Sequence, residues 1–443
     1  MLNSFFSFRK KRVLWGSIVA GILSGTSLQA MSINEAVAYA LKHATPVQQS
    51  RYDVEQARLT RKQARVQQFG ELNLLADYNR YDSPRTLAPL TPSVMQSGTP
   101  IAEARGIFSL GMLYSVPLFT GFAQMRQLQI ATLAQEMSKA KVHLSKEELA
   151  YNVRSLYLTI LAQSELIKAQ KAYIRGQKAL ERQVSQWIDA GKKAPVDRLK
   201  VQADLQNAQA ILASLQSGRE ITRATLKALI GTDPGRLQAL KIHPRPPRNN
   251  LGSLKKQIPR LRKMRLEELA VKKSDVAIKK SRSAKLPQIS LTAYAGENFG
   301  EDTAHNLGME HEKIWQIGLH ANWNLVDFGK RDLETQKARI AKMKAQLKRE
   351  QTRRDLEKLL HQGLARIRES YAKYKAELSG LELSRKSEAI ETARYESGVA
   401  TLNDLLLAKG RSQLARAKTI ESRYNYQKSI YYLDYLLERG VRK

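Results

Sequence analysis

Four stretches of the chain alternate apolar and polar residues with a period of two, which is the pattern of a β-strand with one apolar face. The alternation predicts strands over residues 71–81, 107–118, 288–298 and 315–325. The last stretch is the most regular, and its apolar positions are Trp315, Ile317, Leu319, Ala321 and Trp323. Strands of about 10 residues with this alternation are long enough to cross a bilayer as part of a barrel.

The segments between the strands have helical spacing and are far longer than the strands. Residues 121–194 contain no proline, and about 70 residues of helix span about 100 Å. Pro195 follows a tight turn at residues 190–193 and suits the first turn of a returning helix, which ends near Gly231. In the second half, a heptad seam typical of coiled coils runs through Leu360, Leu364, Ile367, Tyr371, Tyr374, Leu378 and Leu381.

This order of elements occurs twice. Equivalent residues lie 207 positions apart, as in Gly111 and Gly318, Gly191 and Gly398, and Asp197 and Asp404. The repeat predicts two homologous halves of helix, strand, strand and helix, at residues 31–231 and 261–443. A proline-rich linker at residues 232–260 joins them.

Residues 1–30 have the features of a secretory signal peptide. A basic segment at residues 9–12 precedes an apolar segment at residues 13–23, and small residues up to Ala30 place the cleavage site after Ala30. No later apolar run approaches the roughly 20 residues that a membrane-spanning helix needs. If the mature chain crosses a membrane, we expect it to do so with strands.

Composition narrows the chemistry. The chain has no cysteine, which excludes disulfides, thiolate metal sites and cysteine nucleophiles. Its formal charge is +33, and removal of the four signal-peptide cations leaves +29, from 70 basic and 41 acidic residues. The charge has two interpretations. It gives the protein a very basic solvated surface, or it attracts the protein to acidic lipid headgroups or an acidic cell-wall polymer. With a signal peptide present, we expect no nucleic-acid partner.

The alternating strands have two interpretations. A soluble sandwich has one apolar and one polar face on each strand, and so does a barrel with lipid outside and water inside. Four strands cannot close a barrel alone, and open strand edges are not tolerated in lipid. The membrane interpretation therefore requires oligomerisation, and three copies give twelve strands.

Several segments resemble the TolC-like outer membrane efflux protein family, and the resemblance covers essentially the whole mature chain. The matching segments are residues 33–36 in the first helix, 286–289 where a strand opens, 117–121 and 323–329 where strands lead into long helices, and 395–398 with 414–417 at the second tip and last helix. The first half departs from the strand-opening motif, with Phe69 and Gly70 in place of Leu-Pro.

The resemblance implies a mostly α-helical fold with a transmembrane β portion. Three copies form a 12-stranded β-barrel that is continuous with a long periplasmic α-helical coiled-coil barrel. The implied function is an outer membrane channel-tunnel of a Gram-negative bacterium that exports small toxic compounds with a periplasmic adaptor and an inner-membrane transporter. A duct for type I protein secretion is an alternative, and a periplasmic coiled-coil scaffold without a pore is another. A scaffold has no need for lipid-facing apolar bands.

The same resemblance assigns residues to sites. Asp197 and Asp404, each six residues after a turn glycine, and Tyr395 match positions of the family's periplasmic gate. Gly191 and Gly398 match the tip turns, where the adaptor docks. Two positions depart from the pattern, because Ala400 replaces a latch arginine and Leu407 replaces a second acid. We therefore expect a simpler or less cation-selective gate.

Each of these residues also has a purely structural interpretation. Asp197 and Asp404 fall near the third position of a helix, where an acid caps free amides and suits the helix dipole. Tyr395 is equally consistent with a core residue or a latch donor. Trp315 and Trp323 lie at either side of an apolar band and suit the aromatic girdles of a membrane barrel.

No catalytic or cofactor constellation is evident. His305 and His311, beside Asp302, Glu310 and Glu312, have no recognised metal-site spacing, and a solvated polar loop is the simpler interpretation. No phosphate-binding glycine loop and no group of nucleophile, base and orienting residue can be nominated. We expect no enzymatic activity, no cofactor and no metal.

Overall fold

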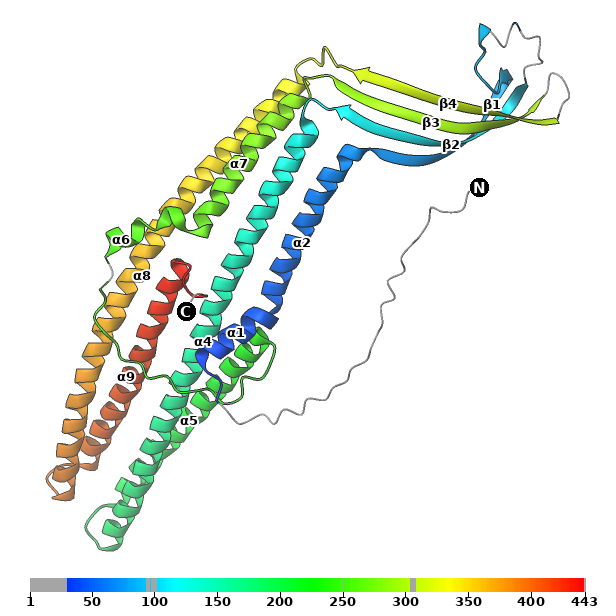
Figure 1. Ribbon diagram of the computed structural model, residues 1–443. Coiled ribbons are helices and arrows are strands. Elements are labelled where there is room, and N and C mark those ends of the chain that lie inside the picture. Colours follow the sequence, from blue (N-terminus) through cyan, green and yellow to red (C-terminus); the bar gives the residue numbers. More distant parts are fainter. Residues whose placement is uncertain (1–29, 93–95, 97–101, 249, 303–307, 442–443) are drawn as a thin grey trace.

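The computed structural model describes residues 30–92, 96, 102–248, 250–302 and 308–441 (Figure 1). The expected signal peptide, apart from Ala30, lies outside these residues, and so does His305. Long helices form an elongated body, and a sheet extends from one end of that body. Among the described residues, no helix has an apolar stretch of the length and hydropathy that spanning a bilayer requires.

The body consists mainly of long helices that run side by side. In chain order the helices are α1 (Ile33–His43), α2 (Thr45–Val66), α4 (Ala123–Asp189), α5 (Pro195–Ile230), α6 (Leu251–Lys255), α7 (Arg262–Ser283), α8 (Lys330–Glu396) and α9 (Leu402–Leu436), with 3-10 turns at Gln67–Phe69 and Ile258–Arg260. A capping box of Ser32 and Glu35 begins α1. Ala44 separates α1 from α2, and Pro46 lies in the first turn of α2, where a helix tolerates proline.

The two halves repeat the same elements. The helices α4 and α8 both have 67 residues and start 207 positions apart, and α5 and α9 start 207 apart as well. The helices α2 and α7 both have 22 residues but start 217 positions apart. The offset between equivalent residues changes in the loop that joins the two strands of each half. This loop is residues 87–102 in the first half and only residues 303–307 in the second.

The four strands form one antiparallel sheet in the order β1-β2-β3-β4. They are β1 (Glu71–Thr86), β2 (Glu103–Phe119), β3 (Gln288–Asp302) and β4 (Gly308–Asn322). The strands therefore extend beyond the predicted ranges at the end far from the helices, whereas β4 ends earlier than predicted. Trp323 and Leu325 lie past its end, because Arg331 of α8 binds the carbonyl oxygens of Asn324 and Leu325 and draws this segment into a turn.

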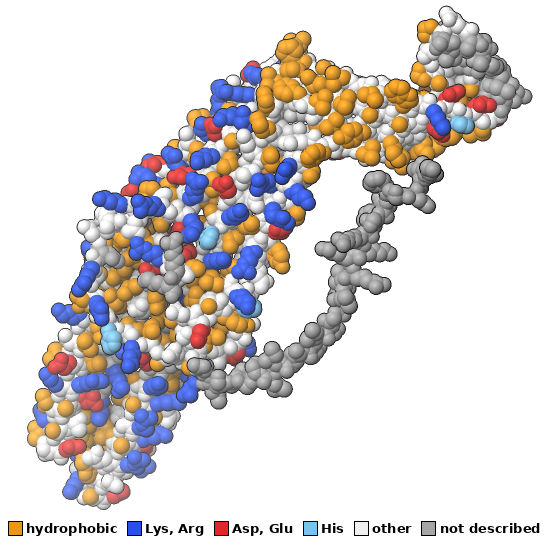
Figure 2. All heavy atoms as spheres, in the orientation of Figure 1, with side chains coloured by type: hydrophobic (Ala, Val, Ile, Leu, Met, Phe, Trp, Pro, Cys, Tyr) orange, Lys and Arg blue, Asp and Glu red, His pale blue; other side chains and the backbone are white. Residues whose placement is uncertain are grey.

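Apolar side chains line up across one face of the sheet. Leu74 lies opposite Met112, Met112 opposite Ala295, and Ala295 opposite Trp315. Side chains of Leu74, Met112 and Trp315 are exposed to 69%, 55% and 76%. On β3 and β4 this apolar face ends at an ion pair between Glu297 and Lys313, 3.8 Å apart. Figure 2 shows the resulting apolar surface on the sheet, whereas Lys and Arg side chains cover much of the helical body.

The three largest hydrophobic clusters of the body lie at its middle and at its tips. One lies where α1 meets α4, and it contains Val47, Val153, Tyr157 and Leu226. A second joins α6 and the start of α7 to α8 and α9. A third joins all four long helices at their far ends. The predicted seam on α8 is confirmed for its buried leucines and isoleucine, but Leu378 is 46% exposed in the single chain.

Candidate functional site

The two tips farthest from the sheet are tight turns with the same backbone. In the first, the N–H of Lys192 donates to the carbonyl of Trp187 (2.8 Å), and the N–H of Gly191 donates to Ile188 (2.9 Å). In the second, Val399 donates to Arg394 (2.8 Å) and Gly398 to Tyr395 (3.1 Å). Each pair of bonds satisfies carbonyl groups at the end of a long helix.

Both turn glycines have left-handed backbones, with φ of 73° at Gly191 and 79° at Gly398. A Cβ atom at either position would meet no atom within 4 Å. The backbone conformation, and not lack of space, therefore requires glycine at both tips. The turns predicted from the sequence are confirmed, while their role in adaptor docking stays a prediction.

The helix that follows the second turn begins with a capping box. The N–H of Asp404 donates to Oγ1 of Thr401 (3.2 Å), and the Asp404 carboxylate accepts from the N–H and the hydroxyl of Thr401 (3.1 and 2.7 Å). These hydrogen bonds hold the pKa of Asp404 below its ordinary value. Helix-start stabilisation by Asp404 is thus visible in the structure, and a pore-lining role remains a proposal.

Asp197 occupies the equivalent helix position without an equivalent cap. Pro195 is the first residue of α5, and the preceding Ala194 has no side chain that can accept a hydrogen bond. The Asp197 carboxylate lies 3.5 Å from the ammonium of Lys200, which stands 207 positions before Leu407. The first half therefore places a cation where the second half has an exposed leucine.

Tyr395 is the buried centre of the tip. Its side chain is 1% exposed and packs among Val184, Val201 and Leu405. Its hydroxyl has no hydrogen-bond partner among the described residues. Burial raises the pKa of Tyr395 to about 12, with a smaller contribution from the negative charge of Asp197.

Two contacts to Tyr395 come from the first hairpin. The ring of Trp187 lies 5.6 Å from the ring of Tyr395, and the ammonium of Lys193 lies 4.4 Å from its centroid. Lys193 is the counterpart of Ala400, which is itself 7% exposed within the same cluster. Sequence reasoning missed both Trp187 and Lys193. The repeat offset was the available signal, because it pairs Lys193 with Ala400.

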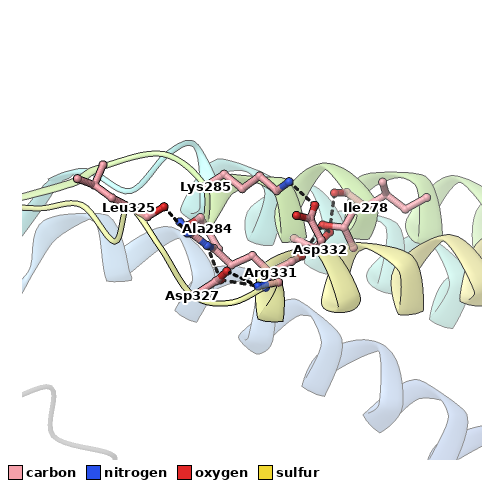
Figure 3. Close-up of polar contacts among 10 residues, drawn as sticks. Ile278, Ala284, Lys285, Leu325, Asp327, Arg331 and Asp332 are labelled. Atoms are coloured by element: carbon pink, nitrogen blue, oxygen red, sulfur yellow. Dashed lines mark hydrogen bonds and ion pairs between the residues drawn. The ribbon is translucent and has the colours of Figure 1, made fainter.

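A second polar cluster lies where the sheet joins the helical body (Figure 3). The Asp327 carboxylate accepts from the backbone N–H and Nε of Arg331, at 3.0 and 2.5 Å. The same guanidinium donates to the carbonyls of Asn324 and Ala284 and so links the turn after β4 to the end of α7. Lys285 and Asp332 form an ion pair beside it.

The two tryptophans proposed for the aromatic girdle lie at the two ends of the apolar face of the sheet. Trp315 is within β4, two residue pairs from Lys313, and Trp323 is at the junction. The indole N–H of Trp323 donates to the carbonyl of Lys285 at 3.1 Å, and 58% of the side chain is exposed. An indole with one bonded end and one exposed apolar face suits a membrane–water interface. The girdle assignment itself stays a prediction.

The loop histidines do not form a metal site within the described residues. No group of three or more potential ligands is close enough there to hold a metal ion. His311 lies beside Phe299, with ring centroids 6.1 Å apart, and His305 is outside the described residues.

The chain is similar to known proteins in both sequence and fold. The chain matches the family model described as outer membrane efflux protein, over residues 37–232 and 253–437. Comparison with curated protein sequences gives no match.

Solved structures with the same fold span almost the whole chain. A membrane protein from Pseudomonas aeruginosa is 18% identical with a TM-score of 0.76, covering 91% of this chain and 90% of that one. The CmeC outer membrane channel of Campylobacter jejuni is 17% identical with a TM-score of 0.75, covering 92% and 86%. The outer membrane protein VceC of Vibrio cholerae is 14% identical with a TM-score of 0.74, covering 92% and 96%.

Proposed function

Because the chain belongs to the outer membrane efflux protein family, we propose that three copies assemble into one export duct. Their twelve strands close a barrel across the outer membrane, and their helices form a tunnel that reaches through the periplasm. The duct performs no catalysis, and its cargo is moved by an inner-membrane transporter through a periplasmic adaptor. Small toxic compounds are the proposed cargo.

The observation that carries this proposal is the pair of unpartnered edges on the single chain. In the sheet, β1 and β4 are the two outer strands, and each has one edge without a neighbouring strand. An open edge is not tolerated in lipid, because unpaired backbone groups are costly there. Since the exposed apolar face of the sheet suits lipid, each β4 requires a β1 from another copy.

The helices carry a matching pair of edges. On α2, the side chains of Tyr52, Leu59 and Val66 recur every seven residues and are 73%, 53% and 47% exposed. On α8, Leu333, Ile340 and Leu347 recur at the same spacing and are 58%, 49% and 72% exposed. Two antiparallel helices with apolar stripes at one heptad spacing bury both stripes when they pair.

The outer edges of the body fit one another in register. The helix α2 runs toward the sheet and α8 runs away from it, so α2 of one copy lies antiparallel to α8 of the next (Figure 1). Starting from the junction, we pair Val66 with Leu333, Leu59 with Ile340, and Tyr52 with Leu347. Each pair is seven residues from the next on both helices, so the pairing continues without a shift.

We further propose that the tips form the gate of this duct. Asp197, Tyr395 and Asp404 are all in the tip region, at the end of the body farthest from the sheet, where a tube must close to prevent leakage. The carboxylates supply negative charge, and the Tyr395 cluster holds the two hairpins of one copy together. The turns at Gly191 and Gly398 are the surfaces offered to the adaptor.

Cross-linking through introduced cysteines tests the assembly, since the chain has none of its own. Oxidation of the Leu59→Cys/Ile340→Cys variant in outer membranes should give covalent trimers on denaturing gels. Leu59→Cys/Arg339→Cys is the matched control, because Arg339 is turned about 100° from Ile340 on the same helix. Failure of the first pair to cross-link, or equal cross-linking by the control, contradicts the proposed pairing. Soluble, uncross-linked protein in the periplasmic fraction instead favours a scaffold without a pore.

A further inference from the structure

A row of lysines recurs on one face of α8 near the membrane end. Lys330, Lys337 and Lys344 are seven residues apart, and Lys348 follows one turn later. All four are exposed. Lys337 forms an ion pair with Glu334 (2.8 Å), while no ion pair is seen for Lys330, Lys344 or Lys348 among the described residues. Because paired helices repeat every seven residues, these lysines share one face.

The linker between the halves covers the opposite face of α8. Leu254 of α6 and Ile258 lie in one hydrophobic cluster with Leu360, which is fully buried. Lys255 and Glu357 form an ion pair at 3.7 Å beside this cluster. The linker therefore packs on the side of α8 that carries Glu357 and Leu360.

Helix geometry shows which other residues of α8 lie on the same side as the linker. Arg353 and Arg339 are seven and twenty-one residues before Leu360, so they lie on the linker side. Two residues along a helix correspond to a rotation of about 200°. Lys337 and Lys358 each precede a linker-side residue by two positions, so they point to the other side.

The neighbouring helix leaves the lysine row uncovered. Leu261, just before α7, belongs to the same hydrophobic cluster as the linker. Asp275 lies fourteen residues later, which is two heptads, so it is also on the linker side of α7. Residues two positions after the linker-side ones face the other way. They include Ala270 and Ala277 of α7 and Ala284, which directly follows it. Short apolar side chains therefore flank the lysines, and no carboxylate of α7 faces them.

We propose that Lys330, Lys337, Lys344 and Lys348 line the bore of the membrane-proximal tunnel and attract anions, so that anionic small molecules are the cargo class this stretch favours. The inference rests on the proposed duct. In a tube of three copies, a linker on the inner side would obstruct the bore, so the linker side is the outer surface. The lysine row then faces inward, as rings of three cations at about 10 Å intervals.

The charge of the body is concentrated in the same region. The helices α2 and α7, with residues 123–146 of α4 and 330–354 of α8, carry 27 Lys and Arg against 9 Asp and Glu, a net charge of +18. The tip-side remainder of α4 and α8, with α5 and α9, carries 25 against 19, a net charge of +6. Low-dielectric walls with charge of one sign concentrate counter-ions in the enclosed water.

The radius of the bore, compared with the screening length, determines how the attraction of anions depends on salt concentration. Twelve helices spaced by about 10 Å enclose a bore of roughly 14 Å radius. Charges are screened over about 10 Å at 0.1 M salt and about 30 Å at 0.01 M. The attraction of anions therefore strengthens as ionic strength falls.

Cysteine modification tests which way the row points. Purified Lys337→Cys trimers in a planar bilayer are treated with a negatively charged methanethiosulfonate reagent, and Arg339→Cys trimers are the matched control. We expect the reagent to change the single-channel conductance of Lys337→Cys by at least about 20% and to leave Arg339→Cys unchanged. An unchanged Lys337→Cys channel, or an equal response of both variants, overturns the inward assignment.

Ion selectivity tests the consequence. Reversal potentials in a salt gradient are compared between the parent, a variant with all four lysines changed to Gln, and a control with four linker-side cations changed to Gln. The control residues are Arg339 of α8 with Arg282, seven residues after Asp275 on α7, and Lys272 and Lys279, each one turn before Asp275 or Arg282. The anion-to-cation permeability ratio should fall at least about twofold in the first variant only, and more at low salt. An unchanged ratio, or an equal fall in the control, overturns the proposal. Absence of conductance steps in the parent would instead contradict the duct itself.

Discussion

At the first tip, Pro195 starts α5 and no side chain caps the helix, whereas at the second tip Thr401 and Asp404 close a capping box at the start of α9. The two turns otherwise have the same hydrogen bonds and the same left-handed glycine. Duplication thus preserved the path of the chain while the side chains diverged. Matching carboxylates can therefore have different surroundings on one backbone.

The two hairpins also contribute different side chains to the contact between them. The second hairpin contributes Tyr395, and the first contributes Trp187 and the ammonium of Lys193 around its ring. The first tip thus supplies charge across the interface, and the second supplies the buried aromatic centre. A substitution in one hairpin therefore leaves the other hairpin as its reference.

Removal of the aromatic centre has the largest expected effect. Tyr395→Ala should destabilise the paired tips by about 3 kcal/mol, because it leaves a cavity in a fully buried site. The matched Ile188→Ala in the first hairpin should cost less, since Ile188 is only partly buried. Hydrogen exchange of the tip amides measures both.

Tyr395→Phe is the control for the hydroxyl. Since that group has no partner among the described residues, its removal should change stability by less than about 1 kcal/mol. A loss as large as that of Tyr395→Ala would show that the hydroxyl is bonded in the assembled tip.

The turn glycines should respond equally. Gly191→Ala and Gly398→Ala each force a side chain into a left-handed backbone, at a cost of about 1–2 kcal/mol per turn. The same exchange measurement, applied to the last turns of α4 and α8, checks this expectation. Costs that differ strongly between the tips would mean that the two backbones are not equivalent.

Moving the capping box from the start of α9 to the start of α5 should reverse the difference in helix-start stability between the two tips. Thr401→Ala removes the second capping box and should cost about 1 kcal/mol, while Ala194→Thr allows a box with Asp197 and should gain a similar amount. Amide exchange in the first turns of α9 and α5 is the readout. If Ala194→Thr destabilises α5, then Asp197 is held by a contact that the new cap disrupts.

Acid should weaken the second tip through its cap. The folded pKa of Asp404 is lowered by its hydrogen bonds to Thr401, so its contribution is present above its unfolded pKa of about 3.9 and is lost as pH falls through the lower folded value. Protection factors of the amides at the start of α9, corrected for the intrinsic exchange rate at each pH, should fall as pH is lowered from 5 through that range. The fall should be absent in Thr401→Ala, and its persistence there would assign it to another group.

Much of the architecture follows from local patterns in the sequence. Period-two alternation located all four strands, the absence of proline located the long helices, and the repeat offset located both turns. The family and its fold are confirmed by the matching family model and the solved structures. The end of β4 was wrong by three residues, because a side chain of α8 captures two carbonyls that alternation alone assigns to the strand.

The candidate gate was predictable only in part. The helix-start position of Asp404 and the left-handed turns are local properties, so spacing was sufficient to find them. Tyr395 meets residues about 200 positions earlier, and a single sequence does not show which faces of two hairpins meet. The difference between Asp197 and Asp404 depends on the residues that precede each helix. These residues are Ala194, which cannot accept a hydrogen bond through its side chain, and Thr401, which can.

Single-channel conductance of purified trimers in a planar bilayer tests the central claim most directly, with the Asp197→Asn/Asp404→Asn variant beside the parent. The claim is that this chain forms a duct whose constriction lies at the paired tips. It predicts discrete conductance steps from the parent, and a changed conductance with reduced cation preference in the variant. No steps from either protein, despite verified insertion of trimers, would contradict the duct, and identical steps from both would remove the two carboxylates from its constriction.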